Sequence, residues 1–202
     1  MIMASLSKCL AFYYKYQPEM HRLYILGDEG SELDAETRAM IQQVGQQCDT
    51  DASKFLECCG KLIEQKFGAI ANCRPAKRLR KKWALEYGVW PTGNNQPRNQ
   101  IWRMRVGVEL RQDGTDALAW VWGDGKLDVE DKMCSEFGST VRRSADFGLD
   151  DGTVVVAQVP LATADGNGIE VDFDQILASI ETGFACIDGS NFQNVYNYIR
   201  NL

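Results

Sequence analysis

Apolar residues recur three and four positions apart through the first half of the chain, which is the spacing of one face of an α-helix. Ser31 and Asp34 resemble a capping box, and they predict a helix that runs through Met40 and Val44. A second helix is predicted from Thr50 or Asp51 to Gly68, because its apolar residues form one continuous stripe. That stripe consists of Phe55, Leu56, Cys59, Leu62, Ile63 and Phe67.

A third helix is predicted over residues 75–87. Pro75 suits the first turn of a helix, and Leu79, Trp83 and Tyr87 follow at intervals of four. We expect the cations of this segment to face solvent on the remaining arc: Lys77, Arg78, Arg80, Lys81 and Lys82. Residues 88–100 carry two prolines and two glycines, which predicts a connecting loop and a boundary after a helical region at 1–90.

After residue 100 the period of the pattern changes from 3.6 to 2. Residues 101–111 alternate apolar and polar side chains, which predicts a strand with one face in water. Residues 112–116 predict a hairpin turn into a second strand over 117–122, and the apolar run 153–160 predicts a third. Helices are expected after Asp128 and after Asp172 or Asp174. The order of elements predicts an α+β fold, with a helical half packed on a small, mostly antiparallel sheet, and regions 1–90 and 101–202 forming one compact unit.

Charge is distributed unevenly along the chain. Residues 74–112 carry 10 Lys or Arg against 2 Asp or Glu, whereas residues 113–202 carry 5 against 16. The basic belt is the set Arg74, Lys77, Arg78, Arg80, Lys81, Lys82, Arg98, Arg103, Arg105 and Arg111. Such a belt can bind an acidic protein surface or nucleic acid, or it can be neutralised by the acidic last third of the same chain.

The sequence offers little for catalysis or for binding a cofactor or a metal. His21 is the only histidine, which excludes metal sites and catalytic groups that need two. An enzyme alternative rests on Glu109, which could gather Mg²⁺ with nearby carboxylates as a nuclease or a phosphoryl-transfer enzyme does. Those carboxylates are Asp113, Asp116, Asp124 and Asp128.

The seven cysteines are scattered without the spacing of a disulfide framework, which predicts reduced thiols and a cytoplasmic protein. No apolar run approaches the length that spans a bilayer, so no membrane partner is expected.

The sequence therefore predicts a non-catalytic binding protein, an inhibitor or regulator that occupies the surface of a protein or nucleoprotein partner. Trp90 lies beside a proline in a polar segment and is a candidate anchor for that partner. The predicted contact residues are Trp90 and nine members of the basic belt: Arg74, Lys77, Arg78, Arg80, Lys81, Lys82, Arg98, Arg103 and Arg105. Nucleic-acid binding is the first alternative, because aromatic residues between the cations can stack on bases.

Overall fold

The computed structural model describes residues 8–29, 33–76, 83–95, 102–114, 116–161 and 173–202. Three helices come first: α1 (Lys8–Lys15), α2 (Gln17–Glu29) and α3 (Ala35–Gly68). Strands β1 (Ala71–Pro75), β2 (Ala84–Pro91), β3 (Met104–Leu110) and β4 (Asp116–Gly123) follow. The remaining elements are α4 (Lys126–Phe137), β5 (Arg142–Arg143), the 3₁₀ helix η2 (Ser144–Phe147), β6 (Thr153–Pro160), α5 (Phe173–Phe184) and α6 (Gly189–Arg200).

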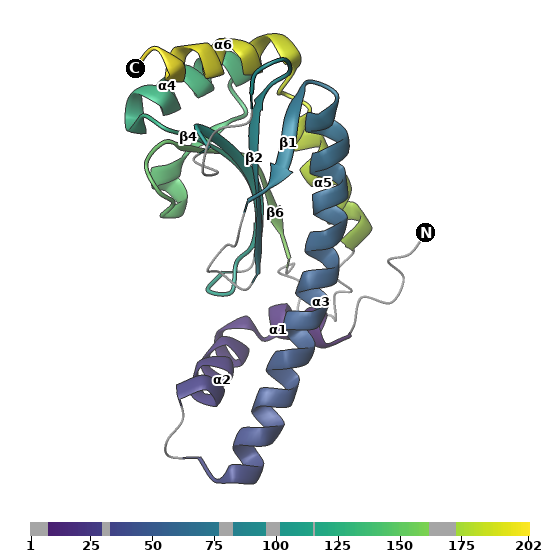
Figure 1. The fold of residues 1–202 in the computed structure, drawn as a ribbon. Coiled ribbons are helices and arrows are strands. Elements are labelled where there is room, and N and C mark those ends of the chain that lie inside the picture. The colour runs from purple at the N-terminus through teal and green to yellow at the C-terminus, as the bar shows by residue number, and fades with distance from the viewer. Residues whose placement is uncertain (1–7, 30–32, 77–82, 96–101, 115, 162–172) are drawn as a thin grey trace.

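The six strands within the described residues belong to one sheet with the order β1-β2-β3-β4-β6-β5, and every neighbouring pair is antiparallel. Figure 1 shows α3 and α5 along one face of this sheet, and α4 and α6 across one of its ends. The predicted α+β class is confirmed. Strand β1 and all but the last residue of β2 come from the region 1–90 of the sequence, and they share the sheet with strands of the region 101–202.

The main core lies between the sheet and the helices. Alternate residues of β3 point into it, as the two-residue period predicts, and Met104, Val106 and Val108 are fully buried there. The helices contribute Phe55, Ile63, Phe67, Ile180 and Phe184. On the other face of the sheet, Leu118 and Trp120 of β4 form a smaller cluster with Phe147 and Val155.

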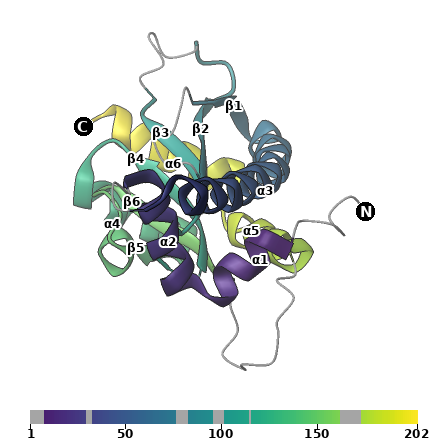
Figure 2. The same ribbon diagram turned by 90° about the horizontal axis from the view of Figure 1, so that it is seen from below.

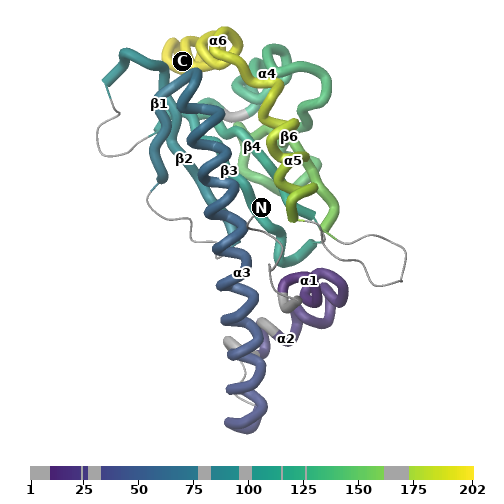
Figure 3. Tube along the Cα trace, turned by 90° about the vertical axis from the view of Figure 1, so that its right-hand side faces the viewer, coloured from purple at the N-terminus to yellow at the C-terminus, as the bar shows by residue number. Residues whose placement is uncertain are grey.

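Helix α3 is continuous through both of the helices predicted within it. Its 34 residues correspond to a length of about 50 Å. Asp34 caps the helix by accepting a hydrogen bond from the Thr37 amide at 2.9 Å. The predicted capping box placed Asp34 inside the helix rather than at its N-cap, and Ser31 lies outside the described residues. The second half of α3 packs on the sheet, whereas the first half extends beyond it (Figure 3).

The arm is the part of the molecule formed by α1, α2 and residues 35–48 of α3. Figures 1 and 2 show α1 and α2 lying beside the first half of α3, and each of these helices contacts the other two. The Tyr13 hydroxyl and the Gln17 amide both donate to the carbonyl of Gln112, at 3.0 and 2.8 Å. The Tyr13 ring also meets the ring of buried Trp83 edge-on, with centroids 4.7 Å apart. These contacts attach the base of the arm to Gln112, which follows β3, and to Trp83, which precedes β2.

The helix predicted over residues 75–87 is wrong. Strand β1 ends at Pro75, β2 begins at Ala84, and residues 77–82 lie outside the described ranges. The predicted loop is also wrong in its first part, since β2 continues to Pro91. Residues 87–91 of β2 are all buried, so this strand shows no alternation between apolar and polar positions. Because the strand lacks that alternation, the interval of four residues between Trp83 and Tyr87 matches the spacing of one face of a helix.

Candidate binding surfaces

The described members of the basic belt do not share one surface. Arg74 is exposed on the edge strand β1, and Arg103 donates to the Ile199 carbonyl at 3.2 Å near the end of α6. Arg105 forms an ion pair within the sheet, whereas Arg111 bonds to Asp113 and to a carbonyl of η2 at the opposite end of β3. The other belt members lie outside the described residues: Lys77, Arg78, Arg80, Lys81, Lys82 and Arg98.

Trp90 is not an exposed anchor, so that prediction is wrong. Its side chain is buried and stacks on Trp102, with ring centroids 5.0 Å apart and planes 18° from parallel. Its indole N–H donates to the Asn94 carbonyl at 3.2 Å. Gly88 makes this arrangement possible, because a Cβ atom there would stand 2.0 Å from the Trp102 ring. Trp90 therefore belongs to the core, although the proline and polar residues after it are typical of a surface loop.

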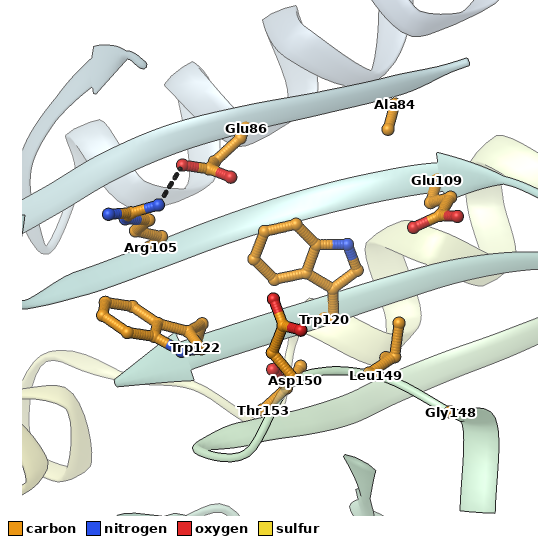
Figure 4. Close-up of a pocket in the computed structure, with 10 residues that line it drawn as sticks. All are labelled: Ala84, Glu86, Arg105, Glu109, Trp120, Trp122, Gly148, Leu149, Asp150 and Thr153. Atoms are coloured by element: carbon orange, nitrogen blue, oxygen red, sulfur yellow. Dashed lines mark hydrogen bonds and ion pairs between the residues drawn. The ribbon is translucent and has the colours of Figure 1, made fainter. Parts of the chain in front are cut away.

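A pocket of about 260 Å³ lies on the sheet face opposite α3 and α5, and we term it the sheet pocket (Figure 4). Strands β2, β3 and β4 provide most of its wall, and residues 148–150 close one side. Trp120 lies across β3 at Gly107, where a Cβ would come within 2.3 Å of the indole. The lining residues are Ala84, Glu86, Arg105, Glu109, Trp120, Trp122, Gly148, Leu149, Asp150 and Thr153.

The charges of the sheet pocket disfavour an anionic ligand. Arg105 Nη1 lies 3.0 Å from Glu86 Oε1, and the guanidinium also stacks on the Trp122 ring at 4.7 Å from its centroid. Besides this pair, Glu109 and Asp150 line the pocket, so its formal charge is negative. A phosphate would meet three carboxylates there and one guanidinium that already has a partner. The sheet pocket is therefore unsuited to nucleic acid.

Of the acidic residues of the enzyme alternative, Glu109, Asp113 and Asp116 lie near Arg111, whereas Asp124 and Asp128 lie apart from them. Arg111 binds Asp113 and lowers the pKa of that carboxyl, and Asp116 accepts a hydrogen bond from Gln158. Asp124 and Asp128 follow the far end of β4, where Gly123 pairs with Met104 rather than with Glu109. Within the described ranges, no group of three or more His, Cys, Asp or Glu residues is arranged to hold a metal ion.

The arm carries an apolar groove of about 240 Å³, which we term the arm groove. All three helices of the arm line it, with Phe12, Tyr13, Met20, Leu23, Met40, Ile41, Val44, Gly45 and Cys48. Four of these side chains are unusually exposed for large apolar residues: Met40 at 64%, Phe12 at 51%, Val44 at 42% and Leu23 at 41%. Contiguous exposed apolar surface of this kind is typical of protein interaction sites.

The groove exists because the apolar stripe of α3 is longer than the sheet that covers it. Phe55, Ala52 and Cys48 are fully buried, and the same face continues through Gly45 and Ile41 into the arm. There the stripe is covered only in part, by α1 and α2. The sequence analysis named Met40 and Val44 only as apolar positions of a predicted helix and assigned no role to their side chains. The available signal was the length of the stripe, which exceeds what one small sheet can bury.

Comparison with known proteins gives no family model, no curated protein and no solved structure that matches this chain. Within the described ranges, no helix is both long and apolar enough to cross a bilayer.

Proposed function

We propose that this protein is a non-catalytic binding protein whose arm groove holds a segment of another protein. The observation that carries the proposal is the exposure of four large apolar side chains, Phe12, Leu23, Met40 and Val44, in one groove that projects beyond the sheet. A binding role needs shape and apolar surface and no catalytic group.

The apolar surface of the groove contributes to binding but does not by itself account for a stable complex. Full burial of a Leu, Met, Val or Phe side chain contributes about 1.5–3 kcal/mol, so completing the burial of four half-exposed ones contributes about 3–6 kcal/mol. The loss of rotational and translational freedom on association costs at least about 4 kcal/mol, which offsets most or all of this gain. Contacts around the rim then decide the affinity, and binding in the micromolar range requires about 8 kcal/mol in total.

The role of inhibitor or regulator follows if the occupied segment is needed by the partner for another contact. Six members of the basic belt remain a predicted second contact, for an acidic surface of the partner or for nucleic acid bound to it: Lys77, Arg78, Arg80, Lys81, Lys82 and Arg98. A cytoplasmic location is part of the proposal. It is supported by free thiols at Cys48, Cys58, Cys59, Cys73, Cys134 and Cys186.

Site-specific photo-crosslinking tests the proposal. A photoreactive amino acid at position 23 probes the groove, and the same residue at the exposed position 178 on α5 is the matched control. In nuclease-treated lysate of the source cells, we expect position 23 to capture a discrete protein that position 178 does not capture. Adding Met40→Asp to the position 23 probe should abolish that product. Identical products from both positions, or a product that survives Met40→Asp, would refute the groove as the binding surface.

A further inference from the structure

We propose that the sheet pocket binds the guanidinium group of a ligand that also carries a carbonyl oxygen, as an arginine residue of another polypeptide does. The pocket lies on the sheet face opposite α3 and α5, and its lining shares no residue with the arm groove. This inference goes beyond the proposed function and does not depend on it.

The floor of the sheet pocket is an aromatic surface beside carboxylates. In the register of the sheet, Gly107 of β3 lies between Glu86 of β2 and Trp120 of β4. Because Gly107 has no side chain, the Trp120 indole lies directly against β3, and only 8% of Trp120 is exposed. A planar guanidinium binds this combination of groups well, since it stacks on an aromatic ring and donates hydrogen bonds to a carboxylate at the same time.

The charges of the pocket favour a cation. Within the described residues, the lining contains three carboxylates and one guanidinium: Glu86, Glu109, Asp150 and Arg105. Arg111 lies near Glu109 but does not line the pocket. Asp113 and Asp116 also lie near Arg111, so these three residues together add no positive charge. A ligand with one positive charge is therefore attracted by the described lining.

One guanidinium of the chain itself already has the contacts that we propose for the ligand. Arg105 pairs with Glu86, and its guanidinium lies over the Trp122 ring. The Glu86 side chain is only 10% exposed, so its carboxylate lies mostly out of water. Trp120 and Asp150 provide a second indole and a second carboxylate in the same pocket, and Figure 4 shows the Asp150 carboxylate directed toward Trp120. The ligand would form a second contact of the same kind there.

Two N–H groups at the pocket favour a ligand that also carries an oxygen atom. Within the part of the chain that the structure describes, Trp120 Nε1 and Arg105 Nε are buried and have no hydrogen-bond acceptor. A buried donor without an acceptor costs free energy. Figure 4 shows the indole nitrogen on the side of the Trp120 ring that faces Glu109. A carbonyl oxygen at this side would accept a hydrogen bond from the indole, while the guanidinium donates to the carboxylates.

Four small ligands test the parts of the proposal on the full chain by calorimetry. The first is capped arginine, Nα-acetyl-arginine amide. Capped citrulline replaces its guanidinium with a neutral urea of the same shape, capped lysine carries an ammonium instead, and butylguanidinium lacks the carbonyl oxygens. We expect capped arginine to bind at least about tenfold more tightly than capped citrulline and about threefold more tightly than the other two. Its affinity should fall as salt is raised.

Two neighbouring aspartates provide matched variants. Both are exposed, but Asp150 lines the pocket and Asp151 does not. Asp150→Asn and Asp151→Asn each remove one negative charge and keep the size of the side chain. We expect Asp150→Asn to weaken capped arginine at least about fivefold and Asp151→Asn to change its affinity less than about twofold. In the native chain, capped arginine should also shift the NMR resonance of the Trp120 indole N–H, which Trp120→Phe identifies.

Each other outcome overturns a stated part of the inference. Equal binding of capped arginine and capped citrulline, equal effects of the two variants, or no binding at all would refute a cation site. Equal binding of capped lysine would refute the preference for a guanidinium, and equal binding of butylguanidinium would refute the carbonyl oxygen and indicate a free guanidino compound. Binding that appears only in Lys81→Ala/Lys82→Ala would show that cations of the chain itself neutralise the pocket. None of these results bears on crosslinking at position 23, so a failure here is distinguishable from a failure of the proposed function.

Discussion

The buried carboxyl group of Glu130 predicts a large and local loss of stability when it is removed. Glu130 lies on α4 and is fully buried. Its Oε1 atom accepts hydrogen bonds from the Ser144 hydroxyl at 2.8 Å and from the Gly152 amide at 2.7 Å. One side chain thus holds both ends of the segment 144–152, which includes the residues that close one side of the sheet pocket.

The magnitude follows from the groups that Glu130→Ala leaves behind. Two buried donors lose their acceptor, and each unsatisfied donor costs about 1–3 kcal/mol. The substitution also removes Glu130 Oε2, which is buried without a hydrogen-bond partner among the described residues, and this offsets about 1 kcal/mol of the loss. We therefore expect the free energy of unfolding to fall by about 3 kcal/mol. With a urea m-value of about 2–3 kcal/mol per molar, the midpoint falls by about 1–1.5 M.

Urea unfolding followed by tryptophan fluorescence measures this change, and hydrogen exchange at the Gly152 amide reports whether the loss begins locally. Asp131→Ala is the matched control on the same helix, because Asp131 pairs with Arg143 at an exposed site. We expect its effect to be much smaller than that of Glu130→Ala. A loss below about 0.5 kcal/mol for Glu130→Ala, with unchanged exchange at Gly152, would show that the two hydrogen bonds do not stabilise the fold.

Two further predictions concern the sheet. Gly107→Ala would place a Cβ atom 2.3 Å from the Trp120 ring and 2.7 Å from the Leu85 carbonyl oxygen. We therefore expect the free energy of unfolding to fall by about 1–3 kcal/mol or more, as measured by thermal unfolding. An unchanged melting temperature would contradict this packing of Trp120 on Gly107. Burial, with a smaller contribution from Glu64, raises the pKa of Cys73 from 9.0 to about 12. Above pH 9 the Cys73 thiol therefore loses its proton in the unfolded chain before it does so in the folded protein. Because this favours the unfolded chain, the free energy of unfolding falls as pH rises from 9 toward 12. Cys73→Ala should reduce the slope of the unfolding free energy against pH in that range.

The elements with a clear period were predictable from the sequence. The alternation in residues 101–111 gave β3, and the stripe from Phe55 to Phe67 gave the second half of α3, because each pattern reflects one face in water and one in the core. Strand β2 was missed for the opposite reason. Its buried part has both faces covered, and the space above Gly88 is filled by Trp102, a contact that no local pattern reveals.

The candidate site was harder to predict than the fold. Charge clusters are visible in a sequence, so the basic belt was found, but three of its four described members, Arg103, Arg105 and Arg111, bond to different partners within the chain. The arm groove depends on where the sheet ends relative to α3, which is a tertiary property. Met40 and Val44 look the same in the sequence whether a second layer covers them or not.

One uninterrupted helix connects the arm to the body of the molecule. Because α3 contains no proline and keeps its hydrogen bonds from Ala35 to Gly68, it is a stiff rod rather than a hinge. A segment seated at its first half is consequently presented at a constant distance and orientation from the sheet. Lengthening α3 by one residue between positions 48 and 52 would rotate the groove by about 100° around the rod and carry the bound segment to a different side of the protein.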